Sequence, residues 1–476
     1  MLTWRPVSTA AVDGRPNTDD TSEPPLRVTA FERRFGHPPG LVLLFFTEMW
    51  ERFSYYGMRA LLVLYMMKYL LLADRAETVV GLTALRRALE WLFGPLDIQP
   101  LASQIYGFYT GLVYLTPILG GLLADRVLGQ RRTVIVGAVL MAIGHFMMAF
   151  EALFLFALLA LILGNGAFKP NISTQVGGLY AAGDRRRDRA FSIFYVGINL
   201  GAFLAPLVCG TLGEAAGWHY GFAAAGVGMT LGLAIYLYAV PTLPPDALAQ
   251  RMAAGEARRF GREEWRAILA LLILSLPVTF YWATYEQQGN TIALWADQYT
   301  DRAIDLKFFE TEIPTTWFQA FNPFMIFAFT PLIVALWGWQ GARGSEPSTV
   351  SKMAIGCFLN AASYLILFVA AWHSGDAKAS WLWLLAYFIV ITIGELYLSP
   401  TALALVSKVA PAGFLSMMMG VWLATSFYGG FLAGYLGSFW SGMAKQDFFL
   451  MIAIIAALAG VAVVSFHRPL KAILKE

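Results

Sequence analysis

Long apolar runs, separated by short polar segments, fill the chain from about residue 38 onward. A helix needs about 20 consecutive, mostly apolar residues to cross the hydrocarbon core of a bilayer. Runs of this kind occur at 41–72, 101–124, 132–150, 152–172, 190–213, 220–241, 266–296, 314–338, 351–372, 380–407, 414–440 and 447–466. The pattern therefore predicts an all-α integral membrane protein with twelve spanning helices.

The polar segments divide these runs into two sets of six. We expect an N-terminal six-helix bundle at 38–241, a polar cytoplasmic linker at 242–265, and a C-terminal bundle with a short cytoplasmic tail at 266–476. Residues 1–37 contain "GRPNTDDTSEPP" and no apolar core, which indicates a disordered cytoplasmic tail. The apolar positions within 73–100 recur at helical spacing, so we expect an amphipathic surface helix there rather than a further span.

The distribution of basic residues predicts which side of the membrane the termini occupy. With the N-terminus inside, 23 of the 34 Lys and Arg residues fall in cytoplasmic segments, against seven in outer segments and four within spans. The strongest contribution comes from "DRRRDR" at 184–189. Because basic residues accumulate on the cytoplasmic side, we expect both termini to be cytoplasmic.

The composition agrees with a membrane protein and excludes other classes. Hydrophobic residues make up 58% of the chain and charged residues 14%, whereas soluble domains have about 45–50% and about 25%. The net charge of +3 gives no indication of nucleic-acid binding. Cys209 and Cys357 both lie inside apolar runs, where we interpret them as small core residues rather than a disulfide or a metal site.

The first apolar run contains charges that a simple membrane anchor does not need. Its first half reads "TEMWERFSYYGMRALL" from Thr47 to Leu62. At 100° per residue the charged and tyrosine positions share an arc of about 140° on one face of the helix. They are Glu48, Glu51, Arg52, Tyr55, Tyr56 and Arg59. A structural ion-pair network would account for this face, but two acids and two bases together favour a site that lines a cavity.

Three more charged residues lie within predicted spans, namely Lys169, Glu286 and Glu395. Intramembrane charges of this kind pair with one another or face water, and they mark functional sites. His145, in the third span, is interpreted as a packed core residue. "GINLG" at 197–201 and "GFLAG" at 430–434 have the spacing of close helix packing, and we interpret their glycines as packing residues.

Several motifs resemble one transporter family. The run Glu48-x-x-Glu51-Arg52-Phe53-x-Tyr55-Tyr56-Gly57 matches the first-helix signature of the proton-dependent oligopeptide transporters, and "GGLLADRVLGQRR" at 120–132 resembles a loop signature of the wider major facilitator superfamily. Further segments resemble the family along the chain to about residue 466. They are "GNGAFKPN" (164–171), "FSIFYVGINLGA" (191–202), "FYWATYEQQG" (280–289), "FQAFNP" (318–323), "GELYLSPTALAL" (394–405) and "MMGVWLATSFYGG" (418–430).

The chain departs from the family pattern at two places. Many bacterial relatives insert two extra helices between the bundles, and the linker at 242–265 is too short for them. Animal relatives carry a functional histidine in the second helix, where this chain has Gly107. The resemblance therefore implies a major facilitator fold of twelve spans, with proton coupling that depends on carboxylates.

The resemblance also implies roles for individual residues. A short peptide is a zwitterion, so a cavity that accepts any sequence must bind its two charged ends. Lys169 and Arg59 suit the peptide carboxylate, Glu395 suits the ammonium, and Arg59 with Glu286 is expected to form a gating salt bridge between the bundles. The proton-coupling residues are expected to be Glu48, Glu51, Arg52, Lys169 and Glu286. The other substrate-binding candidates are Tyr55, Tyr56, Tyr109, Asn199, Trp282, Asn322, Trp422 and Ser426.

The resulting hypothesis is a proton-coupled symporter that imports di- and tripeptides across the inner membrane by alternating access. It needs no cofactor beyond the proton gradient, binds no metal or nucleic acid, and is expected to function as a monomer. One alternative is the same mechanism with another solute, such as a nitrate-like anion or a peptide-like drug. A membrane-embedded enzyme such as an acyltransferase needs a nucleophile or a His/Asp pair near one interface, which the sequence does not offer. A receptor that binds peptide without moving it remains a third possibility.

Overall fold

The computed structural model describes residues 30–181, 184–244, 246, 262–306, 309–409 and 415–466. The regular structure of the N-terminal half, within its described residues, consists of helices joined by short turns and loops. Its helices are α1 (Ala30–Phe35), α2 (Pro39–Tyr65), α3 (Ala73–Ala76), α4 (Leu82–Phe93), α5 (Ile98–Leu123), α6 (Gln130–Met147), α7 (Phe154–Gly178), α8 (Arg186–Ala205), α9 (Thr211–Ala215) and α10 (Trp218–Ala239). Short 3-10 or π turns adjoin them: η1 (Met66–Leu70), η2 (Ala124–Leu128), η3 (Glu151–Leu153), η4 (Pro206–Gly210) and η5 (Val240–Thr242).

The C-terminal half contains seven described helices and four short strands. The helices are α12 (Arg262–Tyr285), α13 (Thr291–Gln298), α14 (Phe321–Ala342), α15 (Thr349–Ser374), α16 (Trp381–Val409), α17 (Leu415–Gly437) and α18 (Lys445–Ser465). Two 3-10 turns, η6 (Glu286–Gly289) and η7 (Thr315–Ala320), precede α13 and α14. Strand β1 (Thr300–Asp301) pairs in parallel with β4 (Ala379–Ser380), and β2 (Ala303–Leu306) pairs antiparallel with β3 (Phe309–Glu312).

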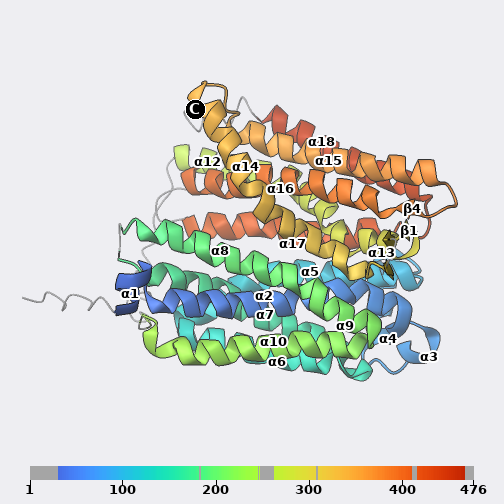
Figure 1. The fold of residues 1–476 in the computed structure, drawn as a ribbon, viewed down its shortest axis with the longest axis horizontal. Coiled ribbons are helices and arrows are strands. Elements are labelled where there is room, and N and C mark those ends of the chain that lie inside the picture. Colours follow the sequence, from blue (N-terminus) through green and yellow to red (C-terminus); the bar gives the residue numbers. More distant parts are fainter. Residues whose placement is uncertain are drawn as a thin grey trace, which may run out of the picture.

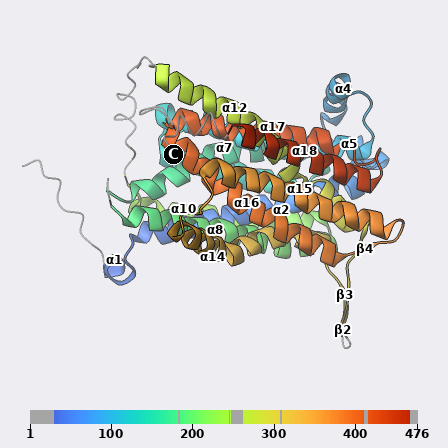
Figure 2. The same cartoon turned by 90° about the horizontal axis from the view of Figure 1, so that it is seen from above.

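The two halves lie side by side, with their long helices running in the same general direction (Figure 1). Helix α1 and the last residues of α18 lie at one end of the molecule, which we call the terminal end (Figure 1). The opposite end, the loop end, carries α3, α4 and the strands. The segment between α2 and α5 contains the expected amphipathic helix, α4, which stands away from the helical body (Figure 2). One face of α4 packs inward through Leu82 and Leu89, while Trp91 is 84% exposed.

The long helices agree with an integral membrane protein. Among the described residues, twelve helices contain 18 residues or more, and nine of these, together with adjoining turns, are long and apolar enough to cross a membrane. The other three are α2, α6 and α17; α2 carries the charged face described above. The count of twelve spans and the cytoplasmic position of the termini stay predictions, as do the domain boundaries, because most of the 242–265 linker lies outside the described residues.

The structure corrects one expectation about local structure and shows a break inside one predicted span. Residues 1–29 lie outside the described residues, but the last part of the expected disordered tail forms α1, which an ion pair of 2.8 Å between Glu32 and Arg186 attaches to the start of α8. The predicted span at 266–296 corresponds to a helical segment, Ile268–Gln298, that is long and apolar enough to cross a membrane. It is interrupted after Tyr285 by η6 and by Asn290, whose φ of −114° and ψ of −99° are not helical. This interruption places Glu286 at a break in the helix.

Glycines allow the two halves to approach closely where α5 meets α17. A Cβ at Gly107 would lie 2.5 Å from the Cα of Gly434, and one at Gly430 would lie 2.7 Å from the backbone nitrogen of Gly111. Glycine at position 107 is therefore required by the close approach of the α17 backbone. In the other small-residue motif, a Cβ at Gly201 would lie 2.2 Å from the carbonyl oxygen of Met49 on α2. The interpretation of these motifs as packing sites is confirmed.

Candidate functional site: a charged cavity between the two halves

A cavity of about 290 Å³ lies between the halves and is lined by residues from both. Its walls come from α2, α5, α7 and α8 on one side, and from α12, η6, η7, α14, α16 and α17 on the other. The cavity brings together ten of the candidate residues. They are Tyr56, Arg59, Lys169, Asn199, Trp282, Glu286, Asn322, Glu395, Trp422 and Ser426.

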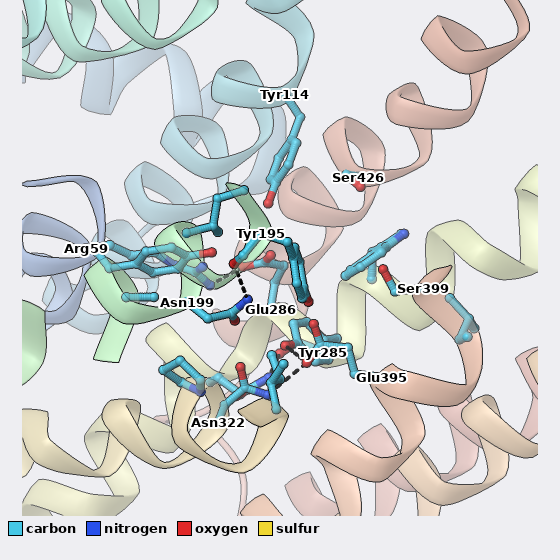
Figure 3. A pocket seen from close by; sticks show the side chains of 18 of the residues that line it. Arg59, Tyr114, Tyr195, Asn199, Tyr285, Glu286, Asn322, Glu395, Ser399 and Ser426 are labelled. Atoms are coloured by element: carbon cyan, nitrogen blue, oxygen red, sulfur yellow. Dashed lines mark hydrogen bonds and ion pairs between the residues drawn. The ribbon is translucent and has the colours of Figure 1, made fainter. Parts of the chain in front are cut away.

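Arg59 and Glu286 connect the two halves across the cavity (Figure 3). Nη2 of Arg59, on α2, donates to Oε2 of Glu286 at the start of η6, and both side chains are almost completely buried. Nε of Arg59 also donates to the hydroxyl of Tyr106 at 2.9 Å. The carboxylate reaches Arg59 because η6 ends the regular helix at this residue. The sequence placed both charges within spans, and the fold makes them partners.

Glu395 belongs to α16 and faces the cavity from the C-terminal half. Its Oε2 accepts a hydrogen bond of 2.7 Å from the hydroxyl of Tyr285 and one of 2.8 Å from the amide of Asn322 (Figure 3). Asn322 donates also to Thr392 at 3.1 Å, which fixes the orientation of its amide. Both bonds to Glu395 use one oxygen, so among the described residues Oε1 has no hydrogen-bond donor. The two bonds hold the Glu395 carboxylate in position, and its Oε1 is available to a ligand.

Lys169 faces the cavity from α7 of the N-terminal half. Its Nζ lies 4.9 Å from the centre of the Tyr114 ring, and it makes no ion pair with any carboxylate of the described residues. Its electrostatic neighbours include Glu48, Glu51 and Arg52. The cavity therefore presents an ammonium without an ion-pair partner on one half and a partly satisfied carboxylate on the other.

The remaining charges of the first helix form a separate buried cluster. Glu48, Glu51 and Arg52 are at most 3% exposed and do not line the cavity. Arg52 donates to both oxygens of Glu51 and lies 3.4 Å from Oε1 of Glu48, while Asn165 of α7 donates to Glu51 at 3.1 Å. Oε2 of Glu48 is buried and accepts no hydrogen bond from the residues that the structure describes. The cluster thus contains one carboxylate whose hydrogen bonding is incomplete.

Two aromatic candidates lie behind the cavity wall rather than in it. Tyr55 and Tyr109 are buried, and their rings stack on each other with centroids 6.5 Å apart. Arg52 lies over the ring of Tyr55 at 5.1 Å. The expectation that these tyrosines line the cavity is wrong, because α2 and α5 pack together at this level and each ring fills the space beside the other.

Sequence reasoning missed several polar residues of the cavity, namely Tyr114, Tyr195, Tyr285, Gln288, Gln319 and Ser399. Three of them had a usable signal, and one of these is Ser399, which follows the identified Glu395 by four residues on α16. Tyr195 precedes Asn199 by four residues, and Tyr285 follows Trp282 by three, so each shares a helical face with a residue that was identified. Gln319 lies in η7, before the start of α14, where helical periodicity gives no information.

The polar contacts between the halves gather at the Arg59–Glu286 pair and toward the loop end. Ser103 donates to Asn290 at 2.8 Å, and Lys68 forms an ion pair of 2.5 Å with Asp297. Gln99 donates to the carbonyl of Gly437 at 2.9 Å. These bonds join the two halves on the side of the cavity that faces the loop end.

Two sets of long apolar helices around a buried, charged cavity define a membrane transporter of the major facilitator type. Comparisons with known proteins identify the family. The model of the POT family matches residues 131–244 and 247–453, and the chain belongs to this family. Its relatives include the peptide transporter YePEPT of Yersinia enterocolitica, which is 34% identical over 90% of this chain and 92% of the relative. The di-/tripeptide transporter of Lactococcus lactis subsp. cremoris is 33% identical, covering 92% and 96%.

Solved structures are similar over nearly the whole chain. A crystal structure of a peptide transporter POT in complex with sulfate has a TM-score of 0.79 and 30% identity, covering 93% of this chain and 97% of that one. A mutant of such a transporter in complex with alafosfalin has a TM-score of 0.79, 32% identity and the same coverage. The resemblance found in the motifs is confirmed, the chain is a multi-pass membrane protein, and the membrane-enzyme alternative is excluded because the family consists of transporters.

Proposed function

We propose that the protein is a proton-coupled symporter that imports di- and tripeptides across the inner membrane by alternating access. The observation that carries this proposal is the distribution of charge in the cavity. Within the part of the chain that the structure describes, Lys169, on one half, has no carboxylate partner, and Glu395, on the other, keeps one oxygen available. A zwitterionic peptide supplies the two missing partners, since its carboxylate suits Lys169 and its ammonium suits Glu395.

The buried cluster of α2 suits proton coupling. Burying a charge is costly unless it is paired, so a change in the protonation of Glu48 changes which partners Arg52 and Lys169 require. Oε2 of Glu48 has no hydrogen-bond partner, which makes this carboxylate the one best placed to hold a proton. Because Lys169 belongs both to the surroundings of this cluster and to the cavity wall, it connects proton binding with peptide binding.

The closed loop end suits one state of the transport cycle. If the terminal end is cytoplasmic, as the basic residues indicate, the conformation described here is closed to the outside. The Arg59–Glu286 pair then belongs to the outer gate. Protonation of Glu286, or a peptide carboxylate bound to Arg59, would remove the charge attraction that holds Arg59 and Glu286 together. Either event would therefore favour opening of the loop end.

Other cargoes are less well supported. A nitrate-like anion has no use for Glu395 and its two hydrogen-bond donors on the C-terminal half. A peptide-like drug has a specific observation in its favour, because a related peptide transporter was crystallised with alafosfalin. We therefore include peptide-like compounds with a free amino group as a second class of solute.

The direct test is uptake of a labelled dipeptide into liposomes with an imposed proton gradient, competed with free amino acids, tripeptides and tetrapeptides. We expect competition by tripeptides but not by amino acids or tetrapeptides. Glu48→Gln, Glu51→Gln and Lys169→Ala should each abolish accumulation, because each removes a charge on which the coupling depends. Peptide exchange without a gradient can survive in some of these variants, since it needs no net movement of protons.

A matched control separates loss of coupling from general damage. Glu90 lies on α4 at the loop end, where it forms an ion pair of 2.9 Å with Arg86. It does not line the cavity. Glu90→Gln should accumulate peptide at the parent rate. Normal accumulation by all three cluster variants would show that the cluster is structural, and binding without uptake by the parent protein would favour a receptor.

A further inference from the structure

A further contact between the halves at the loop end involves none of the residues that form the contacts described above. Glu214 lies on α9 of the N-terminal half and reaches the start of η7 on the C-terminal half. Its Oε2 accepts a hydrogen bond of 2.9 Å from the backbone N–H of Thr315. Its Oε1 accepts one of 2.8 Å from the N–H of Thr316 and one of 2.7 Å from the Thr316 hydroxyl. A single carboxylate thus makes three charge-assisted hydrogen bonds to the other half.

The sequence at the start of η7 explains why the partner must come from elsewhere. The first N–H groups of a helical turn have no acceptor within the turn and need one from a capping residue. The residue before η7 is Pro314, whose side chain has no acceptor, and η7 has no side-chain cap of its own. Thr315 and Thr316 are at most 2% exposed. Glu214 therefore supplies, from the other half, the hydrogen-bond acceptors that the sequence around η7 lacks.

The backbones on both sides of this contact are packed closely. A Cβ at Gly210, in η4, would lie 2.0 Å from Oγ1 of Thr316. The Thr316 hydroxyl also lies 3.5 Å from the carbonyl oxygen of Pro206, and Nε1 of Trp317 donates to the hydroxyl of Thr211 at 2.8 Å. The carboxylate, the two threonines and a glycine that leaves room for them form one compact contact between η4–α9 and η7.

We propose that Glu214 is a latch that holds the loop end closed and must release each time the cavity opens to that side. This inference rests on the alternating access proposed above, and it adds a gating residue to the Arg59–Glu286 pair. The two contacts join different elements: α2 with η6 in one case, and α9 with η7 in the other. Glu214 is only partly buried, so water can hydrate its carboxylate when the halves separate. The latch is therefore reversible, because its bonds are exchanged for bonds to water.

The test measures the opening of the loop end in the full-length protein. Nitroxide labels are placed on cysteines introduced at Tyr220 of α10 and Leu382 of α16, which are 64% and 56% exposed and belong to different halves. Glu214→Gln leaves only one acceptor oxygen and turns an NH₂ group toward the backbone N–H groups of η7. We expect the ratio of open to closed molecules to rise about tenfold, the usual effect of losing one hydrogen bond to a charged group.

The chain offers a closely matched control. Glu151 also lies at the loop end, but it accepts from Tyr69 at 2.7 Å and from Arg75 at 2.8 Å, both within the N-terminal half. Glu151→Gln removes the same charge from the same end without touching the interface. It should leave the distance distribution of the parent protein unchanged.

A second variant keeps the proposal testable if Glu214→Gln is poorly folded. Gly210→Ala retains the carboxylate but places a methyl group against Thr316, so it should also populate the open state. Distributions for both variants equal to that of Glu151→Gln would overturn the latch. The distance does not depend on cargo: a shifted distance in a protein that does not carry peptides would refute the proposed cargo and leave the latch in place. Peptide uptake by the parent protein, together with unchanged label distances in both variants, would support the proposed cargo and overturn the latch.

Discussion

At the scale of single residues, the charged side chains of the cavity differ in whether they already have partners within the protein. Arg59 and Glu286 satisfy each other, and the cluster around Arg52 is mostly satisfied internally. Lys169 and Glu395 are the two charges that retain capacity for a ligand. The sequence identified both residues, because any charge within an apolar run stands out. It could not show which charges are already paired, since pairing depends on helices that lie far apart in the chain.

The role of Glu395 predicts a dependence on the peptide N-terminus. Glu395→Ala should weaken binding of peptides with a free amino group by about 10- to 100-fold, because a hydrogen bond to a charged group contributes about 1.5–3 kcal/mol. N-acetylated peptides lack the ammonium and should lose little. The measurement is inhibition of dipeptide uptake by each member of matched free and acetylated pairs. Equal losses for both members would contradict the assignment of Glu395 to the ammonium.

At the scale of elements, the sequence predicted the helices far better than their interruptions. Apolar length located every long helix, because a span must satisfy its own backbone in the bilayer. Most helix ends agree to within a few residues, but those of α2, α8, α12 and α14 differ by more, since short turns continue the apolar runs there. The break after Tyr285 was missed, since the apolar residues of α13 continue the pattern across η6. Helical spacing also put Tyr55 and Tyr56 on one face, whereas only Tyr56 reaches the cavity. The neighbouring α5 decides this difference, and no pattern within the first helix contains that information.

The close approach of α5 and α17 gives a prediction for the packing of these elements. Gly107→Ala would place a Cβ 2.5 Å from the backbone of Gly434, so the helices must separate. Overpacking of this kind usually costs about 1–3 kcal/mol, and we expect a lower midpoint of thermal unfolding in detergent. Gly121, on the same helix, has no atom within 4 Å of an added Cβ. Gly121→Ala should therefore be neutral or slightly stabilising, and equal losses in the two variants would show that the contact is not the cause.

At the scale of the whole molecule, two of the contacts that join the halves toward the loop end differ in how visible they are in the sequence. Arg59 and Glu286 could be proposed as partners because both are charges within spans. Glu214 gave no signal, since it lies between apolar runs and its partners are backbone N–H groups, which every residue except proline carries. A contact of this kind emerges only when the fold brings α9 beside η7.

Because the two contacts share no residue, they should contribute independently to closure. Glu286→Gln mimics the protonated acid, and we expect it to raise the ratio of open to closed molecules about tenfold at neutral pH, by the same reasoning as for Glu214→Gln. Labels on cysteines at Leu72, after η1, and at Gln298, at the end of α13, report this opening between the two halves. Glu90→Gln again serves as the control. Contributions of separate sites to one equilibrium add as free energies, so the ratios should multiply in the double variant to about a hundredfold.

A double variant that opens no further than either single variant would mean that the two contacts release as one unit. In that case protonation of Glu286 would be sufficient to free Glu214 from η7, and the outer gate would have a single control point.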